Sequence, residues 1–210
     1  MTPNRVMFWQ IDQIWIFYAL ATLSSVLFLG GLAVHLLVWK KSAGSRGVPF
    51  SADALRKMLL DVFLGRRLVE GDVAAGLMHL LIFWGFLVLF IGTNVLAVHH
   101  YVVSFLEGSA YLLFSLGMEL AGLMLLSGVL WALIRRYLQR VPRLERRMED
   151  ALVPLWLLII GLSGFLLEGL RLSSQQPAWG AWSFVGWYFS SLFSPASAEA
   201  FYPACWWIHT

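Results

Sequence analysis

The chain has 210 residues, of which 60% are hydrophobic and 13% are charged, with a formal net charge of +3. This composition excludes an ordinary soluble domain and indicates an integral membrane protein. The positive charge gathers on connections between apolar runs, so it indicates membrane topology and not a nucleic-acid partner. The single cysteine, Cys205, excludes a disulfide within the chain and any zinc or iron–sulfur site with cysteine ligands from this chain alone.

The first apolar run predicts a transmembrane helix over about 13–38. Aromatic side chains flank this run at both ends, as they do at the two interfaces of a membrane. Residues 1–10 carry one arginine and no cleavage site of small residues, so the run is a retained span and not a signal peptide. The span contains His35.

A polar connection, 40–72, follows the first span. From residue 51 onward, apolar residues recur at three- and four-residue spacing, with charged residues between them: Leu55, Leu59, Val62 and Phe63. This pattern predicts a short basic amphipathic helix on the membrane surface. The helix serves either as an ordinary connection or as a docking site for a soluble partner, and the sequence leaves both interpretations open.

The stretch 73–106 contains no Lys, Arg, Asp or Glu and predicts a second span over about 73–98. About 20 apolar residues, at a rise of about 1.5 Å each, cover a hydrocarbon core of roughly 30 Å. Two further apolar runs predict a third span over about 108–134 and a fourth over about 151–170. The link 172–200 is nearly uncharged and rich in aromatic residues, which favours a segment in the headgroup region.

Basic residues set the predicted orientation. Thirteen of the fifteen Lys and Arg residues lie on the connections after the first and third spans, and the exceptions are Arg5 and Arg171. By the positive-inside rule, both connections are cytoplasmic. The N-terminus, the link around His99 and the link 172–200 are then expected outside.

The last ten residues, 201–210, predict the start of a fifth span near residue 201 that enters from the outer side, with Pro203 in its first turn. A segment this short cannot cross a bilayer, so we expect the natural protein to continue and this fifth span to be truncated here. The predicted fold is an all-α membrane bundle of four full transmembrane helices and the start of a fifth, with the N-terminus outside.

The five histidines fall into two groups by predicted depth. His35 and His79 lie toward the cytoplasmic side, and His99, His100 and His209 lie toward the outer side. A histidine inside a membrane span is a candidate functional residue, because it is costly there without a partner. An imidazole can bind haem iron through one nitrogen while its other N–H is donated to a neighbour, so histidines on facing helices point to haem. His35 can instead form a hydrogen bond with a neighbouring helix.

Helical geometry separates His99 from His100. At 3.6 residues per turn, His99 lies about 200° around the helix from His79, whereas His100 lies about 300° around and so on nearly the same face. A straight helix therefore favours His100 as the residue that faces the haem. Both residues stay candidates, because distortion or fraying of the helix would reverse the preference.

Glycines and charged residues inside the spans have more than one interpretation. Glycines along the second to fourth spans leave room for a flat haem or allow the helices to pack closely. Glu119, near the middle of the third span, either relays a proton in quinone chemistry or forms a hydrogen bond with a neighbouring helix. Glu168 and Arg171 are three residues apart and are predicted to pair.

Four sequence motifs carry a family resemblance. They are 76–86, which contains His79, the Gly-Thr pair at 92–93, the arginine-rich link 140–150, and 164–171. Together they resemble the N-terminal membrane domain of heterodisulfide-reductase-related iron–sulfur oxidoreductases. That domain is similar to the gamma subunit of respiratory nitrate reductase, a five-span cytochrome b. The resemblance covers nearly the whole chain, and it implies that 1–210 is one such membrane domain.

The resemblance implies one or two haems b between the second and fifth spans, electron exchange with a membrane quinone or quinol, and a cytoplasmic iron–sulfur domain or subunit as partner. It matches His79 and His209 to ligands of haem iron, and antiparallel helices would pair His209 with His99 or His100. If the fifth span is absent, His35 becomes the only level partner for His79. The expected location is the lipid of a bacterial or archaeal cytoplasmic (inner) membrane.

The sequence therefore predicts a b-type cytochrome subunit or domain that transfers electrons between the quinone pool and a cytoplasmic iron–sulfur oxidoreductase. In this role the chain is the electron-transfer part of an oxidoreductase, and no catalytic residue is assigned to it. The alternative is a haem-free membrane anchor that docks a soluble redox complex through its basic connections.

Overall fold

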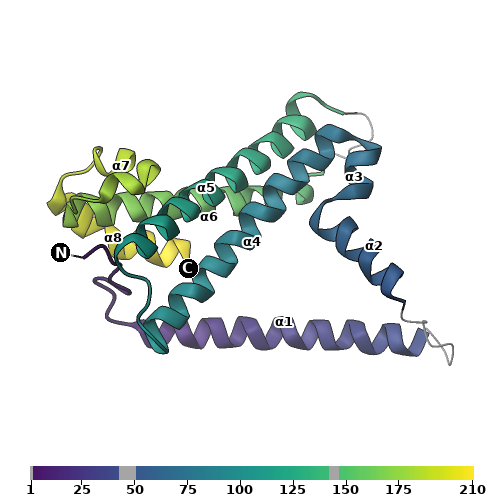
Figure 1. Cartoon of the computed structure of the whole chain (residues 1–210), viewed down its shortest axis with the longest axis horizontal. Coiled ribbons are helices and arrows are strands. Elements are labelled where there is room, and N and C mark those ends of the chain that lie inside the picture. The colour runs from purple at the N-terminus through teal and green to yellow at the C-terminus, as the bar shows by residue number, and fades with distance from the viewer. Residues whose placement is uncertain (1, 43–50, 142–146) are drawn as a thin grey trace.

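The computed structural model describes residues 2–42, 51–141 and 147–210, and in these ranges the chain folds entirely into helices and their connections (Figure 1). The middle of the arginine-rich link, 142–146, lies outside the described residues. The α-helices are α1 (Ile14–Ser42), α2 (Ala52–Phe63), α3 (Arg66–Gly71), α4 (Val73–Tyr101), α5 (Gly108–Leu133), α6 (Glu149–Gln175), α7 (Phe184–Ser190) and α8 (Pro195–His209). A π-helical turn, η1 (Ile134–Leu138), extends α5, and a 3₁₀ turn, η2 (Gly180–Trp182), precedes α7.

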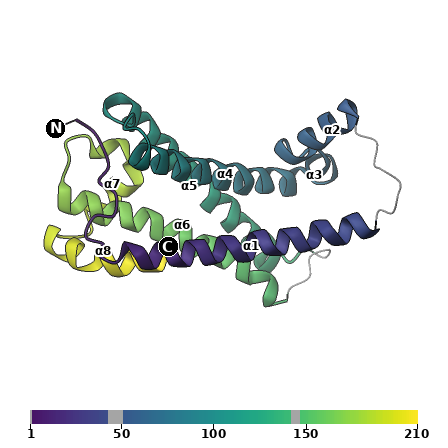
Figure 2. The same cartoon turned by 90° about the horizontal axis from the view of Figure 1, so that it is seen from below.

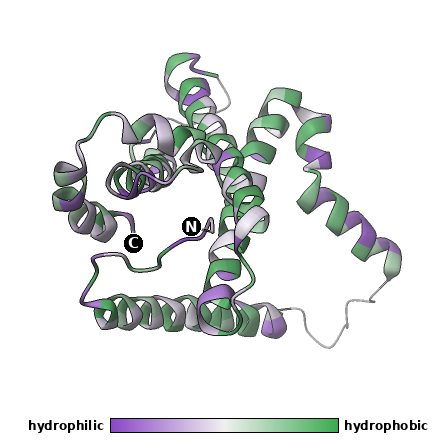
Figure 3. Cartoon of the chain, turned by 60° about the vertical axis from the view of Figure 1, so that its left-hand side comes forward, coloured by the Kyte–Doolittle hydropathy of each residue, from purple (hydrophilic) through white to green (hydrophobic). Residues whose placement is uncertain are grey.

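Four of these helices are long and apolar enough to cross a membrane. They are α1, α4, α5 with its π-helical extension, and α6, and they correspond to the four predicted spans. Figure 3 shows them as mostly hydrophobic along their length. The structure thus confirms the all-α fold with four long apolar helices, and most of these helices run a few residues beyond the predicted ends.

Helices α4 and α5 are antiparallel neighbours whose backbones come into contact at two glycines. A Cβ atom on Gly85 would lie 2.5 Å from the backbone nitrogen of Leu125, and one on Gly128 would lie 2.9 Å from the backbone nitrogen of Ile82. Glycine is required at both positions because any side chain would force the helices apart. The packing interpretation therefore accounts for these two glycines.

The α4–α5 pair is also joined at the end of the bundle where α4 begins and the π-helical turn follows α5, which we call the basic end. One carboxylate oxygen of Asp72 accepts the backbone N–H of Ala75 at 3.1 Å and so caps α4. Its other oxygen accepts Nη2 of Arg135, in the π-helical turn, at 2.7 Å. The Arg135 side chain is only 10% exposed, so this ion pair fixes the register of the two helices.

Helix α6 packs against α5, and α8 packs back along α6. The ring of Phe165 occupies the space over Gly122, where a Cβ would lie 2.7 Å from the ring. Helix α8 begins at Pro195, earlier than the predicted start near residue 201, because Ser194 caps it by accepting the N–H of Ser197 at 3.2 Å. The prediction that Pro203 occupies the first turn is wrong, since this proline lies inside the helix.

The N-terminal segment holds the start of α1 to the other end of the bundle. Ile11 is buried there with Leu170 of α6 and Trp206 of α8. Beyond this point α1 separates from α4, and the two helices diverge from the corner where the hydroxyls of Tyr18 and Tyr101 meet (Figures 1 and 2). None of the residues 14–41 is buried, so the apolar surface of α1 is left for lipid or a further partner.

The close contact at Gly85 gives a test of the α4–α5 packing. We expect Gly85→Ala to lower the stability of the detergent-solubilised protein by about 2 kcal/mol, because the added methyl group overlaps the backbone of Leu125. The matched control is Gly117→Ala on α5, where the new Cβ would have no atom within 4 Å in the described part of the chain. Thermal unfolding should fall by about 4–8 °C in the first variant and stay unchanged or rise in the second. Equal midpoints would contradict the packing described here.

Candidate functional site

His79 lies on an exposed face of α4. Its ring stacks on that of Phe83, one turn further along the helix, with centroids 6.2 Å apart and an interplanar angle of 23°. Among the described residues it has no hydrogen-bonding partner and no second histidine beside it. In the neutral ring one nitrogen carries the proton and the other a free lone pair, so His79 can act as an axial ligand.

His99, near the end of α4, forms hydrogen bonds with the backbone of the turn that follows this helix. Its Nδ1 atom accepts two backbone N–H groups, from Phe105 at 3.1 Å and from Leu106 at 3.0 Å. An Nδ1 that accepts these bonds carries no proton, so in the neutral ring the proton is on Nε2. His99 therefore holds the turn between α4 and α5, and neither of its nitrogens offers a free lone pair.

His100 is exposed, and its ring lies edge-on against Phe8 with centroids 5.9 Å apart. Phe8 in turn lies 6.1 Å from the ring of Trp206 on α8. The N-terminal segment thus connects the end of α4 with α8 through a continuous aromatic contact. This role was not predictable from the sequence, because Phe8 lies outside every predicted span.

His209 lies near the end of α8, against α6, where Gly164 leaves room for its ring. A Cβ on Gly164 would lie 3.1 Å from the Cε1 atom of His209. The Nδ1 atom lies 3.1 Å from the carbonyl oxygen of Ile160 and 3.0 Å from Oγ of Ser163. A carbonyl oxygen has no proton to donate, so the hydrogen-bond network assigns the proton to Nδ1. Nε2 then carries the lone pair, and it is the nitrogen that a metal would take.

The depth of His209 differs from the expectation. It contacts the middle of α6, because α8 starts early and has completed most of its length before this residue. We expected it on the outer side, closer to the level of His99 and His100. The contact between His209 and α6 depends on Ser163 and Gly164, which the sequence analysis did not identify as partners.

The structure does not bring the predicted haem ligands into mutual contact. His35 is exposed on the unpacked part of α1, and α4 and α8 do not form a helix pair among the described elements. Within the described ranges, no three His, Cys, Asp or Glu side chains are grouped to hold a metal ion by themselves. Haem requires only two axial imidazoles, and among the five histidines only His99 has its lone pair engaged by backbone N–H groups.

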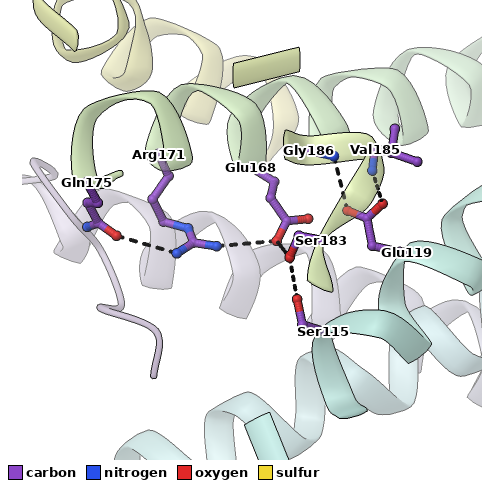
Figure 4. Close-up of polar contacts among 8 residues, drawn as sticks. All are labelled: Ser115, Glu119, Glu168, Arg171, Gln175, Ser183, Val185 and Gly186. Atoms are coloured by element: carbon purple, nitrogen blue, oxygen red, sulfur yellow. Dashed lines mark hydrogen bonds and ion pairs between the residues drawn. The ribbon is translucent and has the colours of Figure 1, made fainter. Parts of the chain in front are cut away.

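A buried polar cluster lies between α5, α6 and α7 (Figure 4). Glu119 on α5 is 1% exposed, and its carboxylate accepts the backbone N–H groups of Val185 at 2.7 Å and Gly186 at 3.2 Å. These N–H groups belong to the first turn of α7, where no residue of the helix itself can satisfy them. The carboxylate therefore caps α7 from a neighbouring helix, which agrees with the hydrogen-bonding interpretation of Glu119.

The second part of this cluster is an ion pair on α6. Nη2 of Arg171 donates to Oε1 of Glu168 at 3.3 Å, which confirms the predicted pairing of these residues. The same carboxylate oxygen accepts the hydroxyl of Ser183 at 2.8 Å, and Ser183 also meets the hydroxyl of Ser115 on α5. Arg171 reaches on to Gln175, at the exposed end of α6. The two serines could not be found from the sequence, because no spacing rule relates them to the acids.

Comparisons with known proteins relate the chain to oxidoreductases. It is 31% identical over 222 aligned positions to an EtfAB:quinone oxidoreductase of Syntrophomonas wolfei, in a match that covers 99% of the chain. It is 26% identical over 173 positions to a probable iron–sulfur-binding oxidoreductase, FadF, of Bacillus subtilis, in a match that covers 75% of the chain.

The chain spans less than a third of the length of these curated relatives, 31% of the first and 23% of the second. No protein-family model and no solved structure matches it. The two matches therefore support a relationship to oxidoreductases, and the predicted likeness to the gamma subunit of nitrate reductase stays a prediction.

The Glu119 carboxylate gives a test of the polar cluster. We expect Glu119→Gln to weaken the anchoring of α7, because the amide can offer only one acceptor oxygen where the carboxylate offers two. The amide hydrogens of Val185 and Gly186 should exchange faster, by roughly one to two orders of magnitude for a loss of about 1–3 kcal/mol. Glu107→Gln is the control, since Glu107 is exposed and its side chain makes no capping hydrogen bond. Unchanged exchange in Glu119→Gln would contradict the assigned role.

Proposed function

We propose that this chain is the membrane electron-transfer part of a quinone-linked oxidoreductase. In this proposal it carries electrons between quinone or quinol in the membrane and an iron–sulfur domain or subunit on the cytoplasmic side. The membrane is the cytoplasmic membrane of a bacterium or archaeon, with both basic connections facing the cytoplasm. The chain as a whole, 1–210, acts as one membrane domain.

The sequence matches carry this proposal. One relative is named as a quinone oxidoreductase and the other as an iron–sulfur-binding oxidoreductase. The alignment with the first of these relatives covers the four helices of this chain that are long and apolar enough to cross a membrane. A membrane segment of a quinone-linked enzyme has access to quinone, because quinones are dissolved in the lipid.

The histidines suit a haem b cofactor. When bound, haem supplies one-electron chemistry through its iron, and the protein supplies axial ligands and an apolar environment. His209 would ligate through Nε2, with its ring oriented by Ile160 and Ser163. His100 is its proposed partner on α4, and His79 is the proposed ligand nearer the basic end.

A haem-free membrane anchor is the second candidate function. It is favoured by the close contacts at Gly85 and Gly128, which assign these glycines to helix packing and leave them no haem to accommodate. In this case the exposed histidines would have no redox role, and the basic connections would only hold a soluble redox complex at the membrane.

Optical spectroscopy distinguishes the two candidates. The product of the complete gene, purified in detergent, should show a b-type signal in its reduced-minus-oxidised spectrum. We expect His79→Ala to lose the haem ligated there, whereas His35→Ala should keep the full signal, because His35 is exposed on the part of α1 that diverges from α4 beyond Tyr18. The haem content per polypeptide is the measurement. Absence of any b-type signal from the complete protein would rule out the cytochrome and leave the anchor.

A further inference from the structure

Helix α2 carries a continuous apolar face that the described part of the chain covers only at Phe63, which contacts α4. None of its residues is buried. The exposed apolar side chains recur at three- and four-residue spacing and so lie on one side of the helix: Leu55, Met58, Leu59, Val62 and Phe63. An apolar face of this kind is unfavourable in water, so it requires an occupant.

The charged residues around α2 are mostly paired with one another. Lys57 pairs with Asp53 at 2.7 Å, and Arg67 pairs with Asp61 at 2.8 Å. Arg56 differs, because it has no acidic partner among the described residues. It borders an open, shallow apolar surface of this one helix, which we call the apolar groove, lined by Ala52, Leu55, Leu59, Leu60, Phe63 and Leu64.

The position of α2 relates this groove to the membrane. The helix lies crosswise to α4 in Figure 1, and α3 and α4 follow it directly in the chain. Its C-terminal end is fixed to α4, because Nε1 of Trp84 donates to the carbonyl oxygen of Phe63 at 2.9 Å and the rings of Phe63 and Phe83 lie 5.9 Å apart. The apolar face of α2 is thus continuous with the side of a membrane-crossing helix.

The length of α4 gives the depth of this contact. Its 29 residues extend about 43 Å, whereas the hydrocarbon core is roughly 30 Å thick. If α4 is centred in the bilayer, Trp84 lies roughly 10 Å inside the hydrocarbon boundary at the basic end. An interfacial amphipathic helix buries its apolar face about 5–10 Å into the boundary between headgroups and acyl chains. The end of α2 is therefore at the depth of such a helix.

We propose that α2 forms a binding site for an anionic phospholipid of the leaflet at the basic end. The acyl chains cover the apolar groove, and the guanidinium group of Arg56 binds the phosphate of the headgroup. A lipid fits better than a protein here, because the covalent connections and the contact of Phe63 with α4 hold the groove at the membrane surface. An arginine that has no acidic partner among the described residues, beside an apolar groove, complements a molecule with an anionic head and an apolar tail. This proposal does not depend on haem.

Crosslinking in the native membrane tests the occupant. A photoreactive benzoylphenylalanine replaces Leu59 in the product of the complete gene, and the adduct is identified by mass spectrometry. We expect an adduct with phospholipid at this position and little or none when the same group replaces Lys57, which lies on the charged side of α2. An adduct between residue 59 and another protein, or equal lipid adducts at both positions, would overturn the proposal.

The role of Arg56 is tested by lipid affinity. Native mass spectrometry of the detergent-purified protein, titrated with phosphatidylglycerol, measures binding of an anionic lipid. We expect Arg56→Gln to weaken binding about fivefold, the effect of one basic residue near an anionic surface, while the matched variant Lys57→Gln changes it less than twofold. Equal affinities of the wild-type protein and Arg56→Gln would overturn the headgroup assignment. A preference of the wild-type protein for phosphatidylcholine would also overturn it.

Discussion

The capping of α7 by Glu119 is the interaction on which one end of the molecule depends. A buried carboxylate inside an apolar bundle is tolerated only with donors around it, and the first turn of α7 supplies two of them. This contact fixes α7 between α5 and α6, and α7 leads directly into α8. Helix α8 then packs on α6 through its own contacts, and Ser163 and Gly164 orient the ring of His209 there.

The long helices were predictable from sequence because membrane crossing depends on length and apolar composition, which any window of the chain reveals. Helix ends were less predictable, because they depend on local caps. Ser194 caps α8, so this helix starts at Pro195, and Pro203, which we predicted in its first turn, lies inside it. The link 172–200 was expected in the headgroup region, and its fold as α7 depends on Glu119, 66 residues away from Val185. Contacts at such separation leave no periodic pattern in the sequence.

In the candidate site, too, the sequence identifies the histidines but not which of their nitrogen atoms are free. Helical geometry favoured His100 over His99, and the structure adds a separate reason, since the free nitrogen of His99 is used by two backbone N–H groups. His209 was matched by family resemblance alone, whereas the orientation of its ring depends on Ser163 and Gly164 of another helix. Histidine count and spacing identified the candidates, and only tertiary contacts distinguished a turn-forming histidine from those with a free lone pair.

The central proposal is that His100 and His209 ligate one haem, whereas His99 holds the turn between α4 and α5. Electron paramagnetic resonance of the oxidised product of the complete gene tests it, because two axial imidazoles give a low-spin ferric signal that reports on both ligands. The account predicts that His100→Ala and His209→Ala remove or convert the same low-spin signal, whereas His99→Ala keeps it. Loss of the signal in His99→Ala with retention in His100→Ala, or no low-spin signal at all, would contradict the account.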